Sequence, residues 1–157
     1  LGEISGFRKN YIVNWLSSVS QTMIIAQNKQ GTTEYLPQRK IVVGTYHGKS
    51  NEQFAMEHIE KSIRFYQSDS SNVDAVIADV RGLYGSFAKL LDYLSGTFYP
   101  VLAKNNVKAQ AIIVKDDVIV NHLSGRIARI GERLSIQSRI FYSIHDAENW
   151  IKEVLKK

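Results

Sequence analysis

The sequence predicts an α/β protein: a mixed, mostly parallel sheet of four to five strands, about four helices and an N-terminal β-hairpin. Three observations carry this prediction. Short apolar runs of strand length alternate with segments in which apolar residues recur every three or four positions. The run at 73–80 (VDAVIADV) is almost continuously apolar, as is typical of a parallel strand covered on both faces. The first two strand-like runs have no helical segment between them, which favours a hairpin.

The first two strands are expected at 23–27 (MIIAQ) and 40–47 (KIVVGTYH), and we predict that they form an antiparallel pair. The helix that follows begins at Ser50 and Gln53, whose spacing fits a capping box. Its buried stripe repeats at helical steps and consists of Met56, Ile59, Ile63 and Tyr66.

The strand at 73–80 is the predicted centre of the sheet, and it ends near Asp79 and Arg81. A short glycine-bounded loop follows, and the next helix opens near Ser86. We expect a kink or a restart of this helix at Pro100, because proline lacks the N–H that a continuous helix needs. Its inner face has helical spacing and consists of Phe87, Leu90, Leu91, Leu94, Phe98 and Val101.

Two further strands and two further helices complete the predicted order. The strands lie at 108–114 (KAQAIIV) and 138–142 (SRIFY). Asp116 and Asp117 are placed to cap the helix after the first of them, and Ser143 begins the last helix. The inner faces of these helices carry Ile119, Leu123, Ile127, Ile130 and Leu134, and then Ala147, Trp150, Ile151, Val154 and Leu155.

Length and composition describe one ordinary domain, which we place at 23–157 after an N-terminal extension, 1–22, of uncertain order. The 157 residues are 44% hydrophobic and 22% charged, which suits a globular protein with a real core. The absence of cysteine excludes disulfides, thiolate catalysis and Cys-ligated zinc. No run of 18 apolar residues predicts a membrane-spanning helix, and no signal peptide is apparent, so we expect a cytoplasmic protein.

Two local patterns, together with the element order, resemble the STAS-like superfamily, the fold of the sporulation anti-sigma-factor antagonist. The first is VDAVIADVR at 73–81, followed by an aromatic-proline step at 98–100 and the strand AIIV at 111–114. The second is the tail IFYSIHDAENWIKEVL at 140–155, which is similar to the ending of uncharacterised bacterial members. The resemblance implies helices mainly on one face of the sheet and a role in protein–protein regulation.

The candidate functional site, here called the rim, lies between the end of the central strand and the start of the next helix. Open α/β sheets place their ligand and partner sites at this position. The rim consists of Asp79, Arg81, Tyr84 and Ser86, and we expect it to bind another protein or a second copy of the chain. The structural alternative is an Asp79–Arg81 pair and a Ser86 that caps the helix. The resemblance also implies a phosphate-accepting serine, for which Ser86 is the nearest candidate, although the family's Asp-Ser-Ser-Gly motif is not present.

A second candidate is the basic face formed by Arg126, Arg129 and Arg133 on one helix. The chain has a net charge of +5, and its Lys and Arg excess lies after residue 100. This face is either a solvated surface or a docking site for an acidic partner or phosphate groups. Because positive charge is spread rather than gathered in runs, we do not expect nucleic acid as a partner.

Catalytic signatures do not appear in the sequence. Metal-ligand spacing, a glycine-rich phosphate loop and a nucleophile elbow are all missing, so we expect no metal, no cofactor and no enzymatic activity. The four histidines are dispersed: His47, His58, His122 and His145. The predicted function is a non-enzymatic regulatory interaction module of STAS-like type. The alternative is a carrier of a small apolar ligand or lipid, held in a pocket between sheet and helices.

Overall fold

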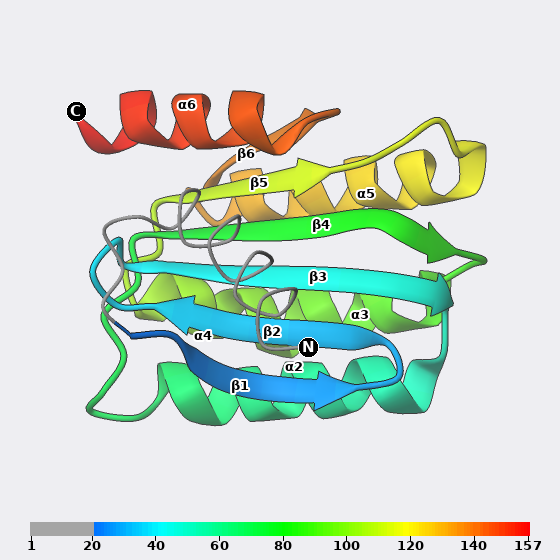
Figure 1. The fold of residues 1–157 in the computed structure, drawn as a ribbon, viewed down its shortest axis with the longest axis horizontal. Coiled ribbons are helices and arrows are strands. Elements are labelled where there is room, and N and C mark those ends of the chain that lie inside the picture. Colours follow the sequence, from blue (N-terminus) through cyan, green and yellow to red (C-terminus); the bar gives the residue numbers. More distant parts are fainter. Residues whose placement is uncertain (1–20) are drawn as a thin grey trace, which may run out of the picture.

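The computed structural model describes residues 21–157, which form a six-stranded sheet whose spatial order follows the chain (Figure 1). The first two strand pairs are antiparallel, and the last three are parallel. The strands are β1 (Met23–Asn28), β2 (Gly31–Leu36), β3 (Ile41–Lys49), β4 (Ala75–Tyr84), β5 (Ala109–Ile113) and β6 (Gln137–Phe141). The predicted α/β class, its mostly parallel sheet and its N-terminal hairpin are confirmed.

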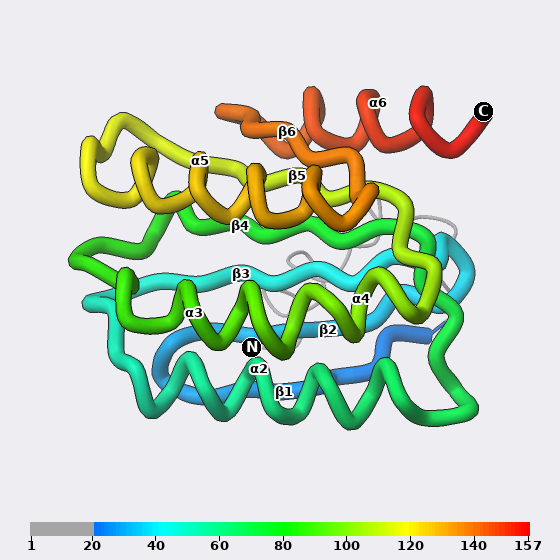
Figure 2. Tube along the Cα trace, turned by 180° about the vertical axis from the view of Figure 1, so that it is seen from behind, coloured from blue at the N-terminus to red at the C-terminus, as the bar shows by residue number. Residues whose placement is uncertain are grey.

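Helices cover both faces of the sheet, in unequal numbers. In the described part of the chain, α2, the broken helix α3–α4 and α5 lie on one face, and α6 lies on the other (Figures 1 and 2). Two separate hydrophobic clusters match these two faces. The helices are α2 (Glu52–Tyr66), α3 (Leu91–Tyr93), α4 (Tyr99–Lys104), α5 (Val118–Arg133) and α6 (Ile144–Leu155).

Strand β2 was not predicted, and it changes the pairing at the N-terminus. The predicted antiparallel pair of 23–27 with 40–47 is wrong, because β2 lies between β1 and β3 and pairs with both. Its sequence, GTTEYL, is mostly polar, so it lacks the apolar run that marks the other strands. Gly31 opens it at φ +144°, where a Cβ would collide with the carbonyl oxygen of Thr45.

Strand β4 extends four residues beyond its predicted end at Val80. After an irregularity in the register, it resumes pairing with β3 through His47 with Gly82 and Lys49 with Tyr84. Tyr84 therefore lies in the strand, whereas the sequence placed it in the loop that follows, and Arg81 lies within the strand instead of at its end. Where Gly82 pairs with His47 the two strands lie very close together. A Cβ on residue 82 would lie 2.9 Å from the Cβ of His47, so glycine permits the pairing.

Helix caps explain where three of the helices begin. Asn51, not Ser50, caps α2, and its side chain accepts the N–H of Phe54 at 2.9 Å. Asp117 caps α5 and Ser143 caps α6, as their positions in the sequence predicted.

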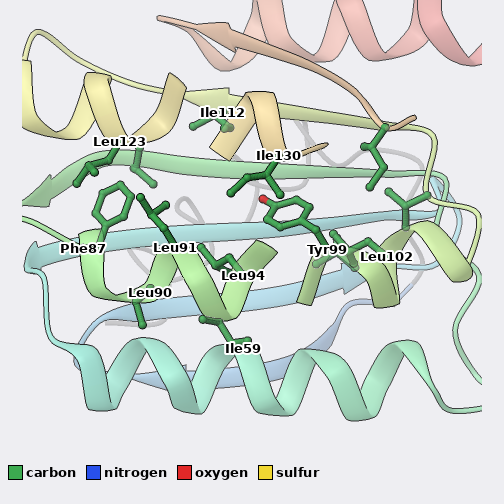
Figure 3. Close-up of a cluster of buried hydrophobic side chains, with 14 of the residues drawn as sticks. Ile59, Phe87, Leu90, Leu91, Leu94, Tyr99, Leu102, Ile112, Leu123 and Ile130 are labelled. Carbon is green, nitrogen blue, oxygen red and sulfur yellow. The ribbon is translucent and has the colours of Figure 1, made fainter. Parts of the chain in front are cut away.

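The segment before Pro100 is interrupted, as predicted. It passes from a 3₁₀ turn at Ala88–Leu90 through α3 to a π-helical turn at Leu94–Phe98 and then into α4. Within the π turn the N–H of Tyr99 reaches back to the carbonyl of Leu94. The wider turn makes room for a proline that cannot donate a hydrogen bond. Leu90, Leu91, Leu94 and Tyr99 point from this segment into the core (Figure 3).

Candidate ligand cavity

A cavity of about 170 Å³ lies between the sheet, the helices α2 and α5, and the broken helical segment 88–104. A cavity of roughly 150 Å³ in another protein accommodates benzene, so this one is large enough for a single ring or a short chain. Apolar side chains form most of its wall, including Val42, Leu90, Leu94, Phe98, Ile112 and Ile127. Among the described residues that line it, none is Asp, Glu, Lys or Arg.

The cavity exists because small residues occupy the middle of the sheet. Gly44 of β3 pairs with Ala78 of β4, and both face the helices at the point where the cavity lies. Ala78 and Val76 lie in the central strand beneath the helices, yet both are only partly buried. The helices therefore leave part of the central strand β4 uncovered, and this uncovered part forms one wall of the cavity. A Cβ at Gly44 would overlap the ring of Tyr46, so glycine also lets that ring lie across the sheet.

A chain of hydrogen bonds lies along one side of the cavity. The backbone N–H of Gln30 fixes which atom donates and which accepts in each of these bonds. The N–H of Gln30 donates to Asn28 Oδ1 at 2.8 Å, so that oxygen is an acceptor. His58 Nε2, 2.9 Å from the same oxygen, must therefore donate. Burial lowers the pKa of His58 and keeps the ring neutral, so Nδ1 accepts from the Thr33 hydroxyl at 2.8 Å. The Thr33 oxygen in turn accepts from Tyr46 at 2.9 Å.

A second group of hydrogen-bonded polar side chains lies in another part of the cavity wall. Gln110 lies in β5 and is 1% exposed. Its Oε1 accepts from the Tyr99 hydroxyl at 2.7 Å, and its Nε2 donates to Ser138 Oγ at 2.9 Å. A Cβ at Gly131 of α5 would collide with Gln110 and Ser138, so glycine allows the helix to pass over this pair. Burial raises the pKa of Tyr99, which stays a neutral donor.

Three hydroxyls in the wall of the cavity have no hydrogen-bond partner within residues 21–157. They belong to Ser62 and Tyr66 of α2 and to Ser124 of α5, and of these three described groups only Ser124 Oγ is fully buried without a partner. All three residues are buried, and Tyr66 is only 1% exposed. Burial raises the pKa of Tyr66 well above its ordinary value, and the nearby hydroxyls of Tyr46 and Tyr99 act in the same direction. An unpaired hydroxyl that is fully buried destabilises a fold by about 1–3 kcal/mol, a cost that applies to Ser124. The hydroxyl-bearing residues Ser62 and Tyr66 line the cavity, where a bound molecule could supply the missing partner.

The predicted rim lies away from the cavity. Every second residue of a strand faces the same side of the sheet. Ala75 and Ile77 pack on the α6 side, so Asp79, two residues further on, also points to that side. Its oxygens accept from Arg81 Nε at 2.9 Å and Nη2 at 2.7 Å. Ser86 is exposed, and its Oγ accepts the N–H of Ala88 at 3.2 Å, next to the 3₁₀ turn. Asp79, Arg81, Tyr84 and Ser86 are all absent from the cavity wall of the described chain.

The predicted basic face is present as a surface of α5. Arg126, Arg129 and Arg133 are all exposed, and Arg133 Nε lies 3.4 Å from the backbone oxygen of Arg129. Within the described residues no group of three or more His, Asp or Glu side chains could hold a metal ion.

Sequence reasoning did not identify the polar residues of the cavity. One signal was available: Gln110 interrupts an otherwise apolar strand, and His58 and Ser62 fall on the inner side of the α2 stripe. A polar residue at an inward position either pairs within the core or faces a ligand.

Comparison with known proteins finds no matching protein family, no similar curated protein and no similar solved structure. None of the helices described here is long and apolar enough to cross a membrane.

Proposed function

We propose that this protein binds a small, largely apolar molecule in the cavity between the sheet, the helices α2 and α5, and the broken helical segment 88–104. The observation that carries the proposal is the partly exposed central strand beneath those helices. Protein interiors are normally packed to crystal density. A space of about 170 Å³ leaves the apolar side chains around it without packing partners on one side. A bound molecule would offset that loss.

The polar groups favour binding over catalysis. Both ring nitrogens of His58 are engaged, one by Thr33 and the other by Asn28, so neither is free to move a proton. Tyr99 and Gln110 are likewise paired with each other. Among the described lining residues His58 is the only ionisable base that could activate a hydroxyl as a nucleophile, and both of its ring nitrogens are already engaged.

Native mass spectrometry of the gently purified full chain tests whether a molecule is retained. Thermal unfolding with and without toluene tests whether the cavity takes an apolar ring. We expect toluene at ten times its dissociation constant to raise the Tm by about 3–5 °C. Ala78→Leu, which fills the cavity, should abolish this shift. The matched control Ala88→Leu changes an exposed residue outside the cavity and should preserve it.

No retained molecule together with no toluene shift would contradict the proposal. So would a toluene shift that survives Ala78→Leu, because the ring would then bind elsewhere.

A second candidate function is protein docking at the carboxyl edge of the parallel strands, as the STAS-like resemblance implies. Four exposed apolar or aromatic residues end or follow β4, β5 and β6, and carboxyl ends of parallel strands meet at one edge. They are Tyr84, Val118, Ile119 and Tyr142, of which Val118 is 84% and Tyr142 70% exposed. Exposed apolar groups of this kind mark interaction surfaces. The predicted rim, Asp79 to Ser86, belongs to the same edge.

Self-association is the form of docking that the purified chain can test. Sedimentation velocity should show a concentration-dependent dimer, which Val118→Ser with Tyr142→Ser should weaken. A strict monomer at all concentrations would exclude a second copy as the partner.

A further inference from the structure

We infer that the molecule held in the cavity is uncharged and carries one hydrogen-bonding group, a hydroxyl or carbonyl, that meets the Tyr66 hydroxyl with Ser62 beside it. This inference rests on the proposed function. It adds the chemical class of the ligand, which the apolar wall alone does not define.

The absence of charge in the wall selects against charged ligands. None of the described lining residues is acidic or basic, apart from His58, whose two ring nitrogens are already engaged. A carboxylate or ammonium group placed there would lose its hydration without gaining an opposite charge. That loss far exceeds what the apolar contacts of one ring supply. Fatty acids, phosphates and amines are therefore disfavoured.

Three tyrosines of the wall differ in how their hydroxyls are used. Tyr46 donates to Thr33 at 2.9 Å, and Tyr99 donates to Gln110 at 2.7 Å. Tyr66 is as deeply buried, yet its hydroxyl has no partner in the described chain. The fold satisfies the first two internally, so of these three tyrosines Tyr66 is the one whose hydroxyl is left for a ligand.

The surroundings of Tyr66 fit an aromatic or alicyclic ligand with one polar end. Phe98 meets the Tyr66 ring edge to face, with centroids 6.4 Å apart. Ser62 lies one helical turn before Tyr66 on the same side of α2, and its hydroxyl is also unpaired. A ligand hydroxyl could accept from one of these groups and donate to the other.

Three probes of one shape separate the possibilities: toluene, p-cresol and p-toluate. They present no polar group, a neutral hydroxyl and a carboxylate on the same ring. Isothermal titration of the full chain at pH 7 measures each affinity. We expect p-cresol to bind about tenfold more tightly than toluene, the effect of a satisfied buried hydrogen bond. We expect no measurable binding of p-toluate.

Two phenylalanine variants test the role of Tyr66 against a matched control. Tyr66→Phe removes an unpaired hydroxyl, so it should leave toluene binding unchanged and make p-cresol bind no more tightly than toluene. Tyr99→Phe removes a paired hydroxyl, so it should lower stability but keep the preference for p-cresol. Ser62→Ala should reduce that preference by a smaller factor.

Each outcome separates the inference from the proposed function. If toluene binds but p-cresol binds more weakly, the cavity is a purely apolar site and this inference fails alone. If p-toluate binds as well as p-cresol, the uncharged class is wrong. If Tyr66→Phe keeps the preference while Tyr99→Phe abolishes it, the polar group meets another hydroxyl. If no probe binds, the proposed function itself fails.

Discussion

The two faces of the sheet use small residues in opposite ways. On the α6 face, Ala75, Ala109, Ala111 and Ala147 are fully buried and pack in one cluster with Ile151. On the α2–α3–α5 face, Gly44 and Ala78 border a cavity, and Ala78 remains partly exposed beneath the helices.

Small sheet residues therefore do not by themselves create a cavity. The helix α6 is continuous from Ile144 to Leu155. Its Ala147 packs against the alanines of the sheet. The segment over the other face is broken into 3₁₀, α and π turns around Leu94–Phe98. We attribute the cavity to small residues beneath an interrupted helix, a combination that only one face has.

The largest expected contrast comes from truncating one isoleucine on each face. Ile151→Ala on the α6 side removes a side chain that is 1% exposed, and we expect a loss of about 3–4 kcal/mol of unfolding free energy. Ile127→Ala borders the existing cavity, so fewer contacts are lost and we expect about 1 kcal/mol. Urea denaturation followed by circular dichroism measures both. Equal losses would mean that the two faces are packed alike.

Enlarging a small residue on each face should give effects of opposite sign. Ala147→Leu forces a larger side chain into a filled cluster and should destabilise by about 1–3 kcal/mol. Ala78→Val extends into the cavity from a strand and should be neutral or stabilise by up to about 1 kcal/mol. Urea midpoints for the two variants decide the sign. A comparable loss for Ala78→Val would show that the space above it is not available.

The smallest effect concerns pH. Burial lowers the pKa of His58 in the folded state, so at pH values near its ordinary pKa the unfolded chain binds more protons than the folded one. Stability should therefore fall as the pH drops from 7 through about 6.5 and below. His58→Gln should flatten this dependence while other groups stay in place. If wild type and variant lose stability in parallel between pH 7 and pH 5, His58 is not the responsible group.

The sequence predicts much of this fold because its strongest signals are local. The continuous apolar run of β4, the caps Asp117 and Ser143 and the interruption before Pro100 each depend on a few neighbouring residues. Strand β2 escaped prediction because its polar residues are held by partners distant in the sequence, such as Thr33 by His58 of α2.

The cavity could not be predicted for a similar reason. It depends on Gly44 and Ala78 meeting across two strands beneath a helix whose π turn the sequence does not specify. The unpaired hydroxyl of Tyr66 is likewise invisible in sequence, because Tyr66 fits the apolar stripe of α2 as well as any core residue. The predicted rim, by contrast, was named from a general rule about strand ends, and it lies at that edge without contributing to the cavity wall.

The most direct test of the central claim is the position of a bound ring. Nuclear Overhauser contacts between toluene and ¹³C-labelled methyl groups of the full chain would locate it. We predict contacts to Leu94, Ile112 and Ile127, which line the cavity, and none to Ile151 of α6. Contacts to Ile151, or contacts only to exposed methyl groups such as those of Val118, would contradict this prediction.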